Sequence, residues 1–525
     1  MREPVHIRER RAAQQEVTAT EEGGHSGEVG TASESMLEFK ADTTTIKRSV
    51  ISAIAIQMLF KVKGVVTMPI VTHFLSPSDL GTLNLIGTAS SLLVPLFCLN
   101  LIQGPAIYLV QESSKDTIRR MYNTVVNASA LISLVASIAL FAAVSVFGAQ
   151  FLHYLPLVVL MVLSSLFQLL PSYVLSAFQK SVKFLKNTTS RDVIATILTI
   201  AFVIGGWSYY GIVAAIAIGN IFAGLLAFKL IRAELPWQAT VDRAILKRFL
   251  RISIPLLPVV FFDWIAQSSS SYFLVYFSSV AAVGKLSVIV GLTNVILSVT
   301  YAMNLFWYPV SARLWIEDRE GYRNAFRLTF VGVATVLLTL VLLFELNSEW
   351  IVRTFARNPE LQEGYPIMGI IAFGFSMQVL INLLTAPLYS NKNVGQILLA
   401  YTGGAAVSIF LNILLIPRFG LLGTAIAMAS SFSTIVIVMG IANYRVAHFQ
   451  FLDRRLSTVF VAFIFLWALS ASIRGSLGEM SCIGLSLASF AALTGLLIRF
   501  GLAKNEKTWL LRLIRRMLRP LSGGA

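Results

Sequence analysis

The sequence predicts an all-α polytopic membrane protein with about 14 transmembrane helices, arranged as two pseudo-symmetric six-helix bundles plus two C-terminal helices. Three observations lead to this fold class: the composition, the spacing of the apolar runs and an internal repeat. Hydrophobic residues make up 56% of the 525 positions and charged residues only 13%, with a mean hydropathy of +0.75. A soluble protein would carry about twice that charged fraction.

Apolar runs long enough to cross a bilayer, which takes about 20 residues of helix, recur along nearly the whole chain. They define the predicted spans 49–74, 83–109, 122–147, 157–178, 192–208, 211–231, 252–277, 285–309, 328–346, 366–389, 395–416, 420–443, 457–473 and 482–500. The connections test this division, because Lys and Arg collect on the cytoplasmic side of membrane proteins. When the N-terminus is placed in the cytoplasm, the cytoplasmic connections and the two tails hold most of the Lys and Arg. Both termini are therefore expected to be cytoplasmic.

An internal repeat with a period of about 205 residues relates the two halves of the chain. FLSPSDLGTLNLI, starting at Phe74, matches FSSVAAVGKLSVI, starting at Phe277, and Gly81 falls on Gly284. Two later matches, LSA with LTA and YGIVAAIA with FGLLGTAIA, fall near the same offset. Six spans followed by six similar spans in the same orientation predict two parallel bundles related by an axis along the membrane normal.

These patterns divide the chain into five parts. They are a disordered cytoplasmic tail at 1–45, an N-terminal six-helix bundle at 46–235, a C-terminal six-helix bundle at 236–445, two extra transmembrane helices at 446–503 and an amphipathic basic cytoplasmic tail at 504–525. The first tail is charged, rich in Ser, Thr, Glu and Gly, and without the apolar region of a signal peptide. The last tail places arginines opposite an apolar helical face, as interfacial helices on anionic lipid do.

Several function classes are disfavoured by the composition. The net charge of +16 lies beside membrane segments, so it fits membrane topology and no nucleic-acid partner is expected. Cys98 and Cys482 lie in apolar runs and the five histidines lack ligand spacing, which argues against a disulfide framework or a metal site. No Walker-type phosphate loop is present, so neither ATP hydrolysis nor a cofactor is expected.

Two lysines, Lys61 and Lys63, lie near the middle of the first predicted span. A charge at that depth costs roughly 2.5–3.5 kcal/mol, unless the helix faces a water-lined cavity or a partner carboxylate. Gln57 and Lys61 share one helical face and Lys63 points away from it, which favours Lys61 as the cavity residue. This buried positive charge predicts transport of a polar, anionic cargo.

Asp263 is the acidic residue deep within a predicted span, and the repeat places it beside the position equivalent to Lys61. We expect Lys61 and Asp263 to face the space between the bundles, either paired or each available to cargo or protons. An architectural ion pair that closes the bundle interface is the alternative.

Further candidate residues fall into two groups. Polar residues beside prolines or along the seventh span are expected to line the cavity: Asn100, Gln103, Gln267, Tyr272 and Asn304. A bending hinge, or hydrogen bonds between helices, would explain the same residues. A basic group in a cytoplasmic connection could attract a lipid diphosphate, or could simply set the topology: Lys180, Lys183, Lys186 and Arg191.

The turn IVTHFLSPSDLGTLNLIG at 70–87 and the phrase RFGLLGTAIAMA at 418–429 resemble Wzx-type polysaccharide flippases of the MOP exporter superfamily. The resemblance covers roughly residues 46–445 and implies a MATE/MOP-like fold, in which the first and seventh helices flank a central cavity. It also implies flipping of an undecaprenyl-diphosphate-linked oligosaccharide from the cytoplasmic to the periplasmic leaflet of the bacterial inner membrane, by alternating access, for surface polysaccharide export such as exopolysaccharide or lipopolysaccharide.

The partners implied by this resemblance are the lipid-linked oligosaccharide and membrane lipids, with a polysaccharide polymerase or export complex as a further candidate. Two other functions within the superfamily stay open as alternatives: a cation-coupled multidrug exporter and a lipid II flippase. The presence of two helices beyond the twelve of the bundles resembles the lipid II flippases. A membrane enzyme of glycan assembly is the alternative from another class. It would need catalytic residues on the long external connection at 347–365, where no recognisable constellation is found.

Overall fold

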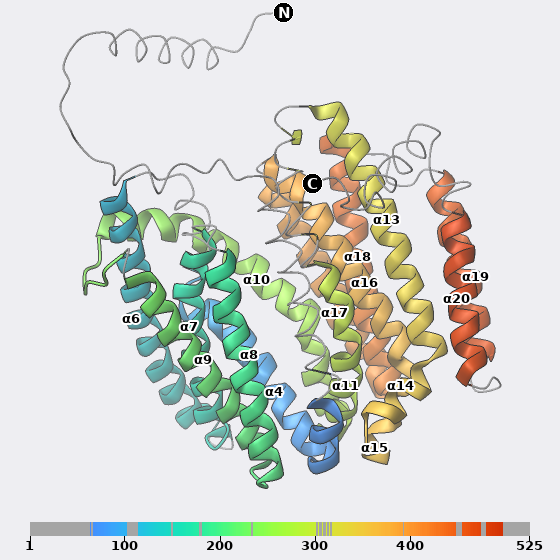
Figure 1. The fold of residues 1–525 in the computed structure, drawn as a ribbon, viewed down its shortest axis with the longest axis horizontal. Helices are drawn as coiled ribbons and strands as arrows, with labels where there is room; N and C mark the ends of the chain where they lie inside the picture. Colours follow the sequence, from blue (N-terminus) through green and yellow to red (C-terminus); the bar gives the residue numbers. More distant parts are fainter. Residues whose placement is uncertain are drawn as a thin grey trace, which may run out of the picture. The chain divides into compact units, whose positions relative to one another are not determined.

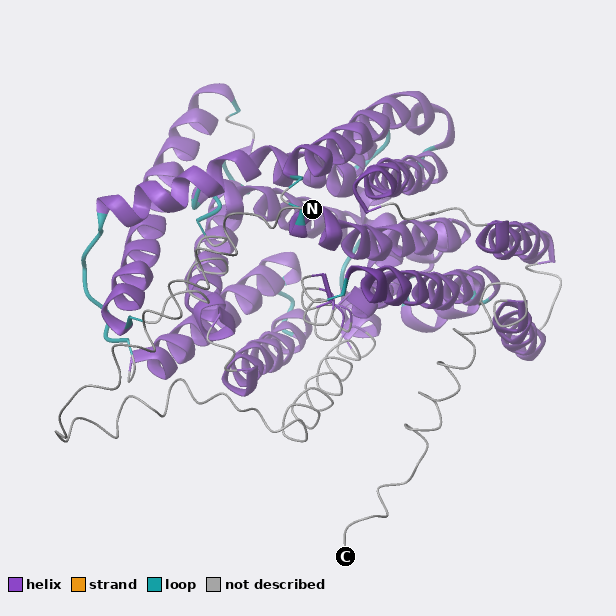
Figure 2. Ribbon diagram, turned by 90° about the horizontal axis from the view of Figure 1, so that it is seen from above, coloured by secondary structure: helices purple, strands orange, loops and turns teal. Residues whose placement is uncertain are grey.

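The computed structural model describes most of the chain after the first predicted span. The described residues are 64, 67–101, 114–148, 151–177, 181–232, 235–300, 303, 307, 311, 314–315, 318–391, 393–447, 454–473 and 479–496. Within these ranges the chain forms helices joined by short loops and no β-strand (Figure 2). The predicted all-α fold class is confirmed.

Both halves of the chain consist of helices in the described residues. The first half contains α4 (Pro77–Phe97), α6 (Lys115–Phe147), α7 (Leu155–Ala177), α8 (Ser181–Ile204) and α9 (Ser208–Arg232). The second half contains α10 (Arg243–Phe277), α11 (Val280–Thr293), η2 (Asn294–Leu297), α13 (Arg319–Leu346), α14 (Ser348–Phe355), α15 (Pro359–Gln362), η3 (Tyr365–Ile367), α16 (Met368–Ser390), α17 (Val394–Phe419) and α18 (Leu421–Ala447). Two C-terminal helices follow: α19 (Arg454–Ile473) and α20 (Glu479–Leu496).

Ten helical segments of the described chain are long and apolar enough to cross a membrane, so this is a multi-pass membrane protein. Every predicted span from the second onward overlaps a described helix, whereas most of the first lies outside the described residues. The clearest difference is α8, which begins at Ser181 although its span was predicted to begin at 192. The charged residues before 192 were interpreted as a loop, but they form the first turns of the helix.

Local sequence explains where α4 begins. Ser76 is its N-cap: the hydroxyl of Ser76 accepts a hydrogen bond from the Asp79 backbone N–H, and the Asp79 carboxylate accepts one from the Ser76 N–H, both at 3.1 Å. Pro77 occupies the first turn, where its missing N–H costs nothing. This capping box fixes the point at which the chain leaves the first span and enters α4.

The same helix ends at Phe97, well before the predicted limit of 109. Leu99 and Asn100 both have left-handed backbone conformations, with φ of 48° and 55°, and the Asn100 N–H donates to the Pro95 carbonyl at 2.7 Å. Left-handed residues of this kind terminate helices, and Asn tolerates that conformation better than most residues. The apolar run continued past this point, so hydropathy alone could not locate the end.

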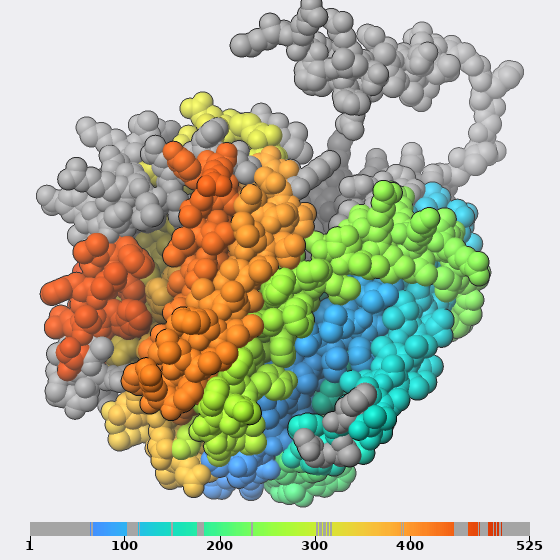
Figure 3. Space-filling view, turned by 180° about the vertical axis from the view of Figure 1, so that it is seen from behind, coloured from blue at the N-terminus to red at the C-terminus, as the bar shows by residue number. Residues whose placement is uncertain are grey.

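Two buried hydrophobic clusters form the cores of the two halves. One is built mainly by α4, α6, α7 and α9 and includes Tyr122 and Leu166. The other is built mainly by α10, α11, α13, α16, α17 and α18 and includes Leu384 and Phe432, and a few first-half residues such as Leu80 also join it. Figure 1 shows α6–α9 side by side and α13, α16, α17 and α18 side by side, with α4, α10 and α11 between these groups. In Figure 3, α10 runs along the surface between α4 and α17.

Helix α10 belongs to both halves. Phe249, near its start, is fully buried in the first cluster, whereas Val259 and Leu274 pack in the second. Pro255 and Pro258 lie between these two parts of the helix. Because proline removes a backbone hydrogen bond, the two prolines weaken α10 where it passes from one core to the other.

A buried polar group holds α10 against α17. The Ser270 hydroxyl donates to Asn412 Oδ1 at 2.9 Å, and Asn412 Nδ2 donates to Ser269 at 3.4 Å and to Ser408 at 3.3 Å. Ser269 and Ser408 are themselves 3.3 Å apart. Ser269 and Ser270 therefore stabilise the contact between α10 and α17. Hydrogen bonding between helices was the alternative to a cavity lining for the polar residues along the seventh span.

The two C-terminal helices pack on the second half through aromatic and polar contacts. Phe373 of α16 stacks on Trp467 of α19 with 5.4 Å between ring centroids. The Trp467 indole N–H donates to the Glu345 carboxylate at 3.2 Å, and the Asn347 amide donates to Ser486 of α20 at 2.9 Å. The end of α13 is thus the polar anchor for both extra helices.

We predict that Asn412→Ala lowers the thermal stability of the detergent-purified protein, measured by circular dichroism. Asn412 is 0% exposed and its amide bonds to three serines, so its loss leaves buried hydroxyls without partners. In a double-mutant cycle with Ser270→Ala, the coupling should be about 0.6–1.7 kcal/mol, the range measured for such bonds in membranes. Ile413→Leu, at the exposed neighbouring position, is the control. Purely additive effects of the two alanine substitutions would contradict the network.

Candidate functional site

Asp263 lies on α10 together with Gln267, one helical turn apart. The Gln267 amide donates to Asp263 Oδ1 at 2.8 Å, the Asp263 side chain is partly exposed, and Gln267 is exposed. Among the described residues, no Lys or Arg lies within ion-pairing distance of the carboxylate. Asp263 therefore presents an acceptor that the described chain leaves without a cationic partner.

Several predicted site residues lie outside the described residues: Gln57, Lys61, Lys63, Gln103, Asn304 and Lys180. The pairing of Lys61 with Asp263 therefore stays a prediction. Asn100 is described and buried, with its amide nitrogen unpaired, at the left-handed end of α4. No described contact brings Asn100 to Asp263.

Tyr272, which is predicted to line the cavity, forms a hydrogen bond between the two halves. Its hydroxyl donates to the Leu85 carbonyl of α4 at 3.2 Å and lies 3.2 Å from the Thr88 hydroxyl. Nearer the start of α10, the Trp264 indole N–H donates to the Thr88 carbonyl at 2.8 Å. The Trp264 and Tyr272 rings lie 5.6 Å apart. Two aromatic side chains of α10 are thus hydrogen-bonded to the backbone of α4.

Nearer the start of α4, the halves meet through two glycines that the repeat had aligned. A Cβ added at Gly81 would overlap the carbonyl oxygen of Val280 at the start of α11. A Cβ added at Gly284 would overlap the carbonyl oxygen of Pro77 at the start of α4. Pro77 and Val280 are themselves equivalent in the repeat, so the contact is reciprocal. Only glycine permits this approach of the two helix backbones.

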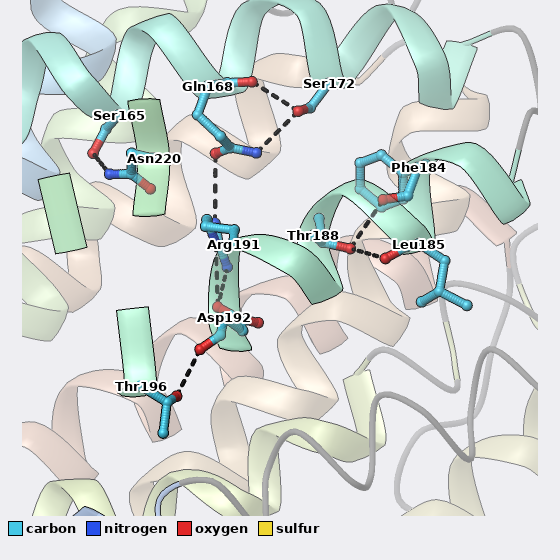
Figure 4. A network of polar contacts seen from close by, with 10 residues as sticks. All are labelled: Ser165, Gln168, Ser172, Phe184, Leu185, Thr188, Arg191, Asp192, Thr196 and Asn220. Carbon is cyan, nitrogen blue, oxygen red and sulfur yellow. Dashed lines mark hydrogen bonds and ion pairs between the residues drawn. The ribbon is translucent and has the colours of Figure 1, made fainter. Parts of the chain in front are cut away.

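The basic group predicted to attract phosphate lies on α8. Lys186 is exposed, and Lys183 and Arg191 are partly exposed. The Arg191 guanidinium donates to Gln168 Oε1 of α7 at 3.5 Å and to the neighbouring Asp192 at 3.0 and 3.1 Å (Figure 4). Arg191 therefore contributes to helix packing.

A buried network extends from this arginine. Gln168 Nε2 donates to the Ser172 hydroxyl at 2.9 Å, and the Asn187 amide of α8 donates to the same hydroxyl at 2.8 Å. Farther along α7, the Asn220 amide of α9 lies 3.3 Å from the Ser165 hydroxyl (Figure 4). These bonds tie α7, α8 and α9 into one unit, as the serines and Asn412 tie α10 to α17.

Sequence reasoning missed Glu345, a second acidic residue inside the apolar part of the chain. It is 4% exposed in the last turn of α13, and a Cβ added at Gly369 of α16 would overlap its carboxylate. The signal was an acid within the apolar run VLLFEL, just inside the predicted end of that span. The Trp467 indole N–H donates to the Glu345 carboxylate, and Trp467 lies on α19. Glu345 therefore helps to bind α19 to the second half.

We predict that Gly81→Ala destabilises the contact between the halves, because the added methyl group would overlap the Val280 carbonyl. Overpacking of this kind costs about 1–3 kcal/mol, and Gly284→Ala should have a similar effect. Together the two substitutions should cost less than their sum, because one separation of the helices relieves both overlaps. Thermal unfolding in detergent is the measurement.

Gly87→Ala is the matched control, since Gly87 lies on the same helix and a Cβ there meets nothing within 4 Å. If Gly81→Ala is as stable as Gly87→Ala, the close crossing of α4 and α11 is not present in the protein.

The fold is similar to those of solved transporters. The chain matches "Lipid II flippase MurJ, inward closed conformation" with a TM-score of 0.62, at 13% identity over 87% of this chain and 99% of that one. It matches the multidrug transporter DinF-BH, solved with a bound ligand, with a TM-score of 0.58, at 16% identity over 82% of this chain and 100% of that one. An outward-facing MATE transporter of the MOP superfamily matches with a TM-score of 0.56, at 12% identity over 80% of this chain and 99% of that one.

At these identities the structures establish the fold alone. No curated protein sequence matches the chain. A profile of a family described as polysaccharide biosynthesis protein matches residues 46–315, just over half of the chain, including Gly81, Asp263 and Gly284. The chain therefore belongs to the polysaccharide biosynthesis protein family.

Proposed function

We propose that the protein flips an undecaprenyl-diphosphate-linked oligosaccharide from the cytoplasmic to the periplasmic leaflet by alternating access, for surface polysaccharide export. Membership of the polysaccharide biosynthesis family supports the class of cargo. The observation that carries the mechanism is the reciprocal contact of Gly81 with Val280 and of Gly284 with Pro77. It joins equivalent points of the two halves by close backbone packing, and each half is also held by side-chain hydrogen bonds of its own, so the contact can open without unfolding either half.

Rigid halves are what such a rocking motion needs. Buried side-chain hydrogen bonds lie within each half, such as Asn187 with Ser172 in the first and Asn412 with Ser270 in the second. Hydrogen bonds also join the halves: Tyr272 and Trp264 of α10 bind α4, and α6 binds the segment that leads into α10 through Asn123, Thr124 and Asn127. We expect movement at the surface shared by α4, α10 and α11, between the proposed bundles at 46–235 and 236–445. The start of α10 would move with the first bundle, because Phe249 lies in its core.

Asp263 and Gln267 supply the polar surface along the proposed route. A carboxylate in apolar surroundings accepts strong hydrogen bonds from sugar hydroxyls and can also carry a proton. Lys61 is proposed to face the same route and to balance the cargo's diphosphate. Lys180, Lys183 and Lys186 keep their proposed role in attracting that diphosphate, whereas Arg191 is committed to Gln168 and Asp192.

The proposed location is the bacterial inner membrane, with both termini in the cytoplasm, as the distribution of Lys and Arg predicts. Flipping breaks and forms no covalent bond, so this function needs no catalytic residues. The cargo lipid and the surrounding membrane lipids are the proposed partners, and a polysaccharide polymerase or export complex would take the cargo on the far side.

The test is a flipping assay in proteoliposomes. An undecaprenyl-diphosphate-linked oligosaccharide with a fluorescent sugar is followed with a quencher that does not cross the bilayer, and protein-free liposomes give the background. We expect the reconstituted protein to expose the inner-leaflet fluorophore to the quencher. Movement of a lipophilic dye cation, with no movement of the glycan lipid, would overturn the cargo assignment.

In the same assay, Asp263→Asn should lower the flipping rate roughly tenfold to hundredfold, the range expected when hydrogen bonds of about 1.5–3 kcal/mol to a charged group are lost. Asp116→Asn is the control, because Asp116 lies at the start of α6 with its side chain 78% exposed. Equal rates for the parent and Asp263→Asn, at equal amounts of folded protein, would remove Asp263 from the route.

A further inference from the structure

Thr72 lies near the end of the first predicted span and contacts the second half of the chain. Residues 67–74 are helical, and Thr72 is 0% exposed. Its hydroxyl oxygen accepts a hydrogen bond from the Arg357 backbone N–H at 3.1 Å. Its proton can be donated to the Phe355 carbonyl at 3.1 Å or to the Met68 carbonyl at 2.8 Å. One hydroxyl of the first half thus engages two backbone groups between α14 and α15 in the second half.

The segment that holds Thr72 is itself well fixed. Gln362 donates to the Ala356 carbonyl at 2.8 Å, and Asn358 accepts from the Glu360 N–H at 3.0 Å as the N-cap of α15. Ala356 and Leu361 are fully buried in the hydrophobic cluster of the second half. The segment 355–363 therefore moves with the second half.

This segment and the residue that follows it also contact α11. Lys285 of α11 forms an ion pair with Glu363. A Cβ added at Gly364 would lie 2.9 Å from the Ile289 side chain, also in α11. The segment thus lies over the end of α11 that approaches Pro77, the end at which the two glycines cross. Leu75, close to Thr72 along the chain, is buried in the same cluster of the second half.

We propose that Thr72 is a positioning residue of the transport cycle. Its hydroxyl binds the segment 355–363, and this segment acts as a latch that holds the two halves together at the predicted outer end. This inference rests on the proposed alternating access. Opening at that end must separate Thr72 from Arg357, because the first belongs to one half and the second to the other. The hydroxyl therefore sets how often the outer end opens.

Spin-label distances test the latch without any cargo. Labels are placed at Phe151, exposed after α6 in the first half, and at Glu360, exposed on α15, with Cys98 and Cys482 replaced by alanine. In lipid nanodiscs, Thr72→Val removes the hydroxyl and keeps the shape of the side chain. We expect the ratio of the long-distance to the short-distance population to rise roughly two- to tenfold, the value of one neutral hydrogen bond.

Thr72→Ser is the matched control, because it keeps the hydroxyl, and its distances should stay those of the parent. A second variant approaches the bond from the other side: Arg357→Pro removes the donor N–H, and Ala356 already has the extended backbone that a following proline requires. Arg357→Ala keeps that N–H and should match the parent. Arg357→Pro decides the question if Thr72→Val does not fold.

The latch is refuted if Thr72→Val and Arg357→Pro keep the parent's distances, or if Thr72→Ser shifts them as much as Thr72→Val. The flipping assay separates this proposal from the cargo assignment. A shift in distances without flipping of the glycan lipid would leave the latch standing and reject the cargo. Flipping by the parent with no shift in either variant would keep the cargo and reject the latch.

Discussion

The rest of the structure depends on how closely α4 and α11 approach each other. Two equivalent glycines lie against two equivalent carbonyl groups, with Gly81 against Val280 and Gly284 against Pro77. Inside a membrane the hydrophobic effect does not drive helices together, so close backbone packing and hydrogen bonds must do so. The crossing places α10 beside α4, where Trp264 and Tyr272 can reach α4 carbonyls.

Buried polar side chains form one hydrogen-bond network within the first half and another within the second half. In the first half, hydrogen bonds link Gln168, Ser172, Asn187 and Arg191 between α7 and α8. In the second half the serines of α10 meet Asn412. A buried polar group without a partner is costly in a membrane, so these networks hold the helices of each half in a fixed arrangement. Asp263 and Gln267 differ because they bond to each other on α10, where Asp263 is partly exposed and Gln267 is exposed.

Much of the fold could be predicted, because it depends on patterns that survive in a single sequence. Apolar length and the distribution of Lys and Arg predicted the helices, and the repeat aligned Gly81 with Gly284 before their contact was visible. The ends of the helices were harder to predict from the sequence. The end of α4 depends on left-handed backbone at Leu99 and Asn100. The early turns of α8 contain Asn187, whose partner Ser172 lies on another helix.

The candidate site was predictable in part for the same reason. Asp263 stood out as a charge in an apolar run, whereas Tyr272 was recognised as polar but its partner on α4 was not foreseeable. Thr72 gave no signal at all, since its importance comes from backbone groups almost three hundred residues away. Contacts of that kind follow from tertiary packing, which local sequence does not encode.

The most direct test of the central claim is to lock the crossing of α4 and α11. Ser78 of α4 and Ala281 of α11 are equivalent in the repeat and adjoin the reciprocal contact, so cysteines at both positions can be joined by a short thiol-cleavable crosslinker. If the crossing must open in each cycle, crosslinked protein will stop flipping the glycan lipid, and cleavage of the linker will restore the rate. Flipping at the full rate by fully crosslinked protein would contradict this account.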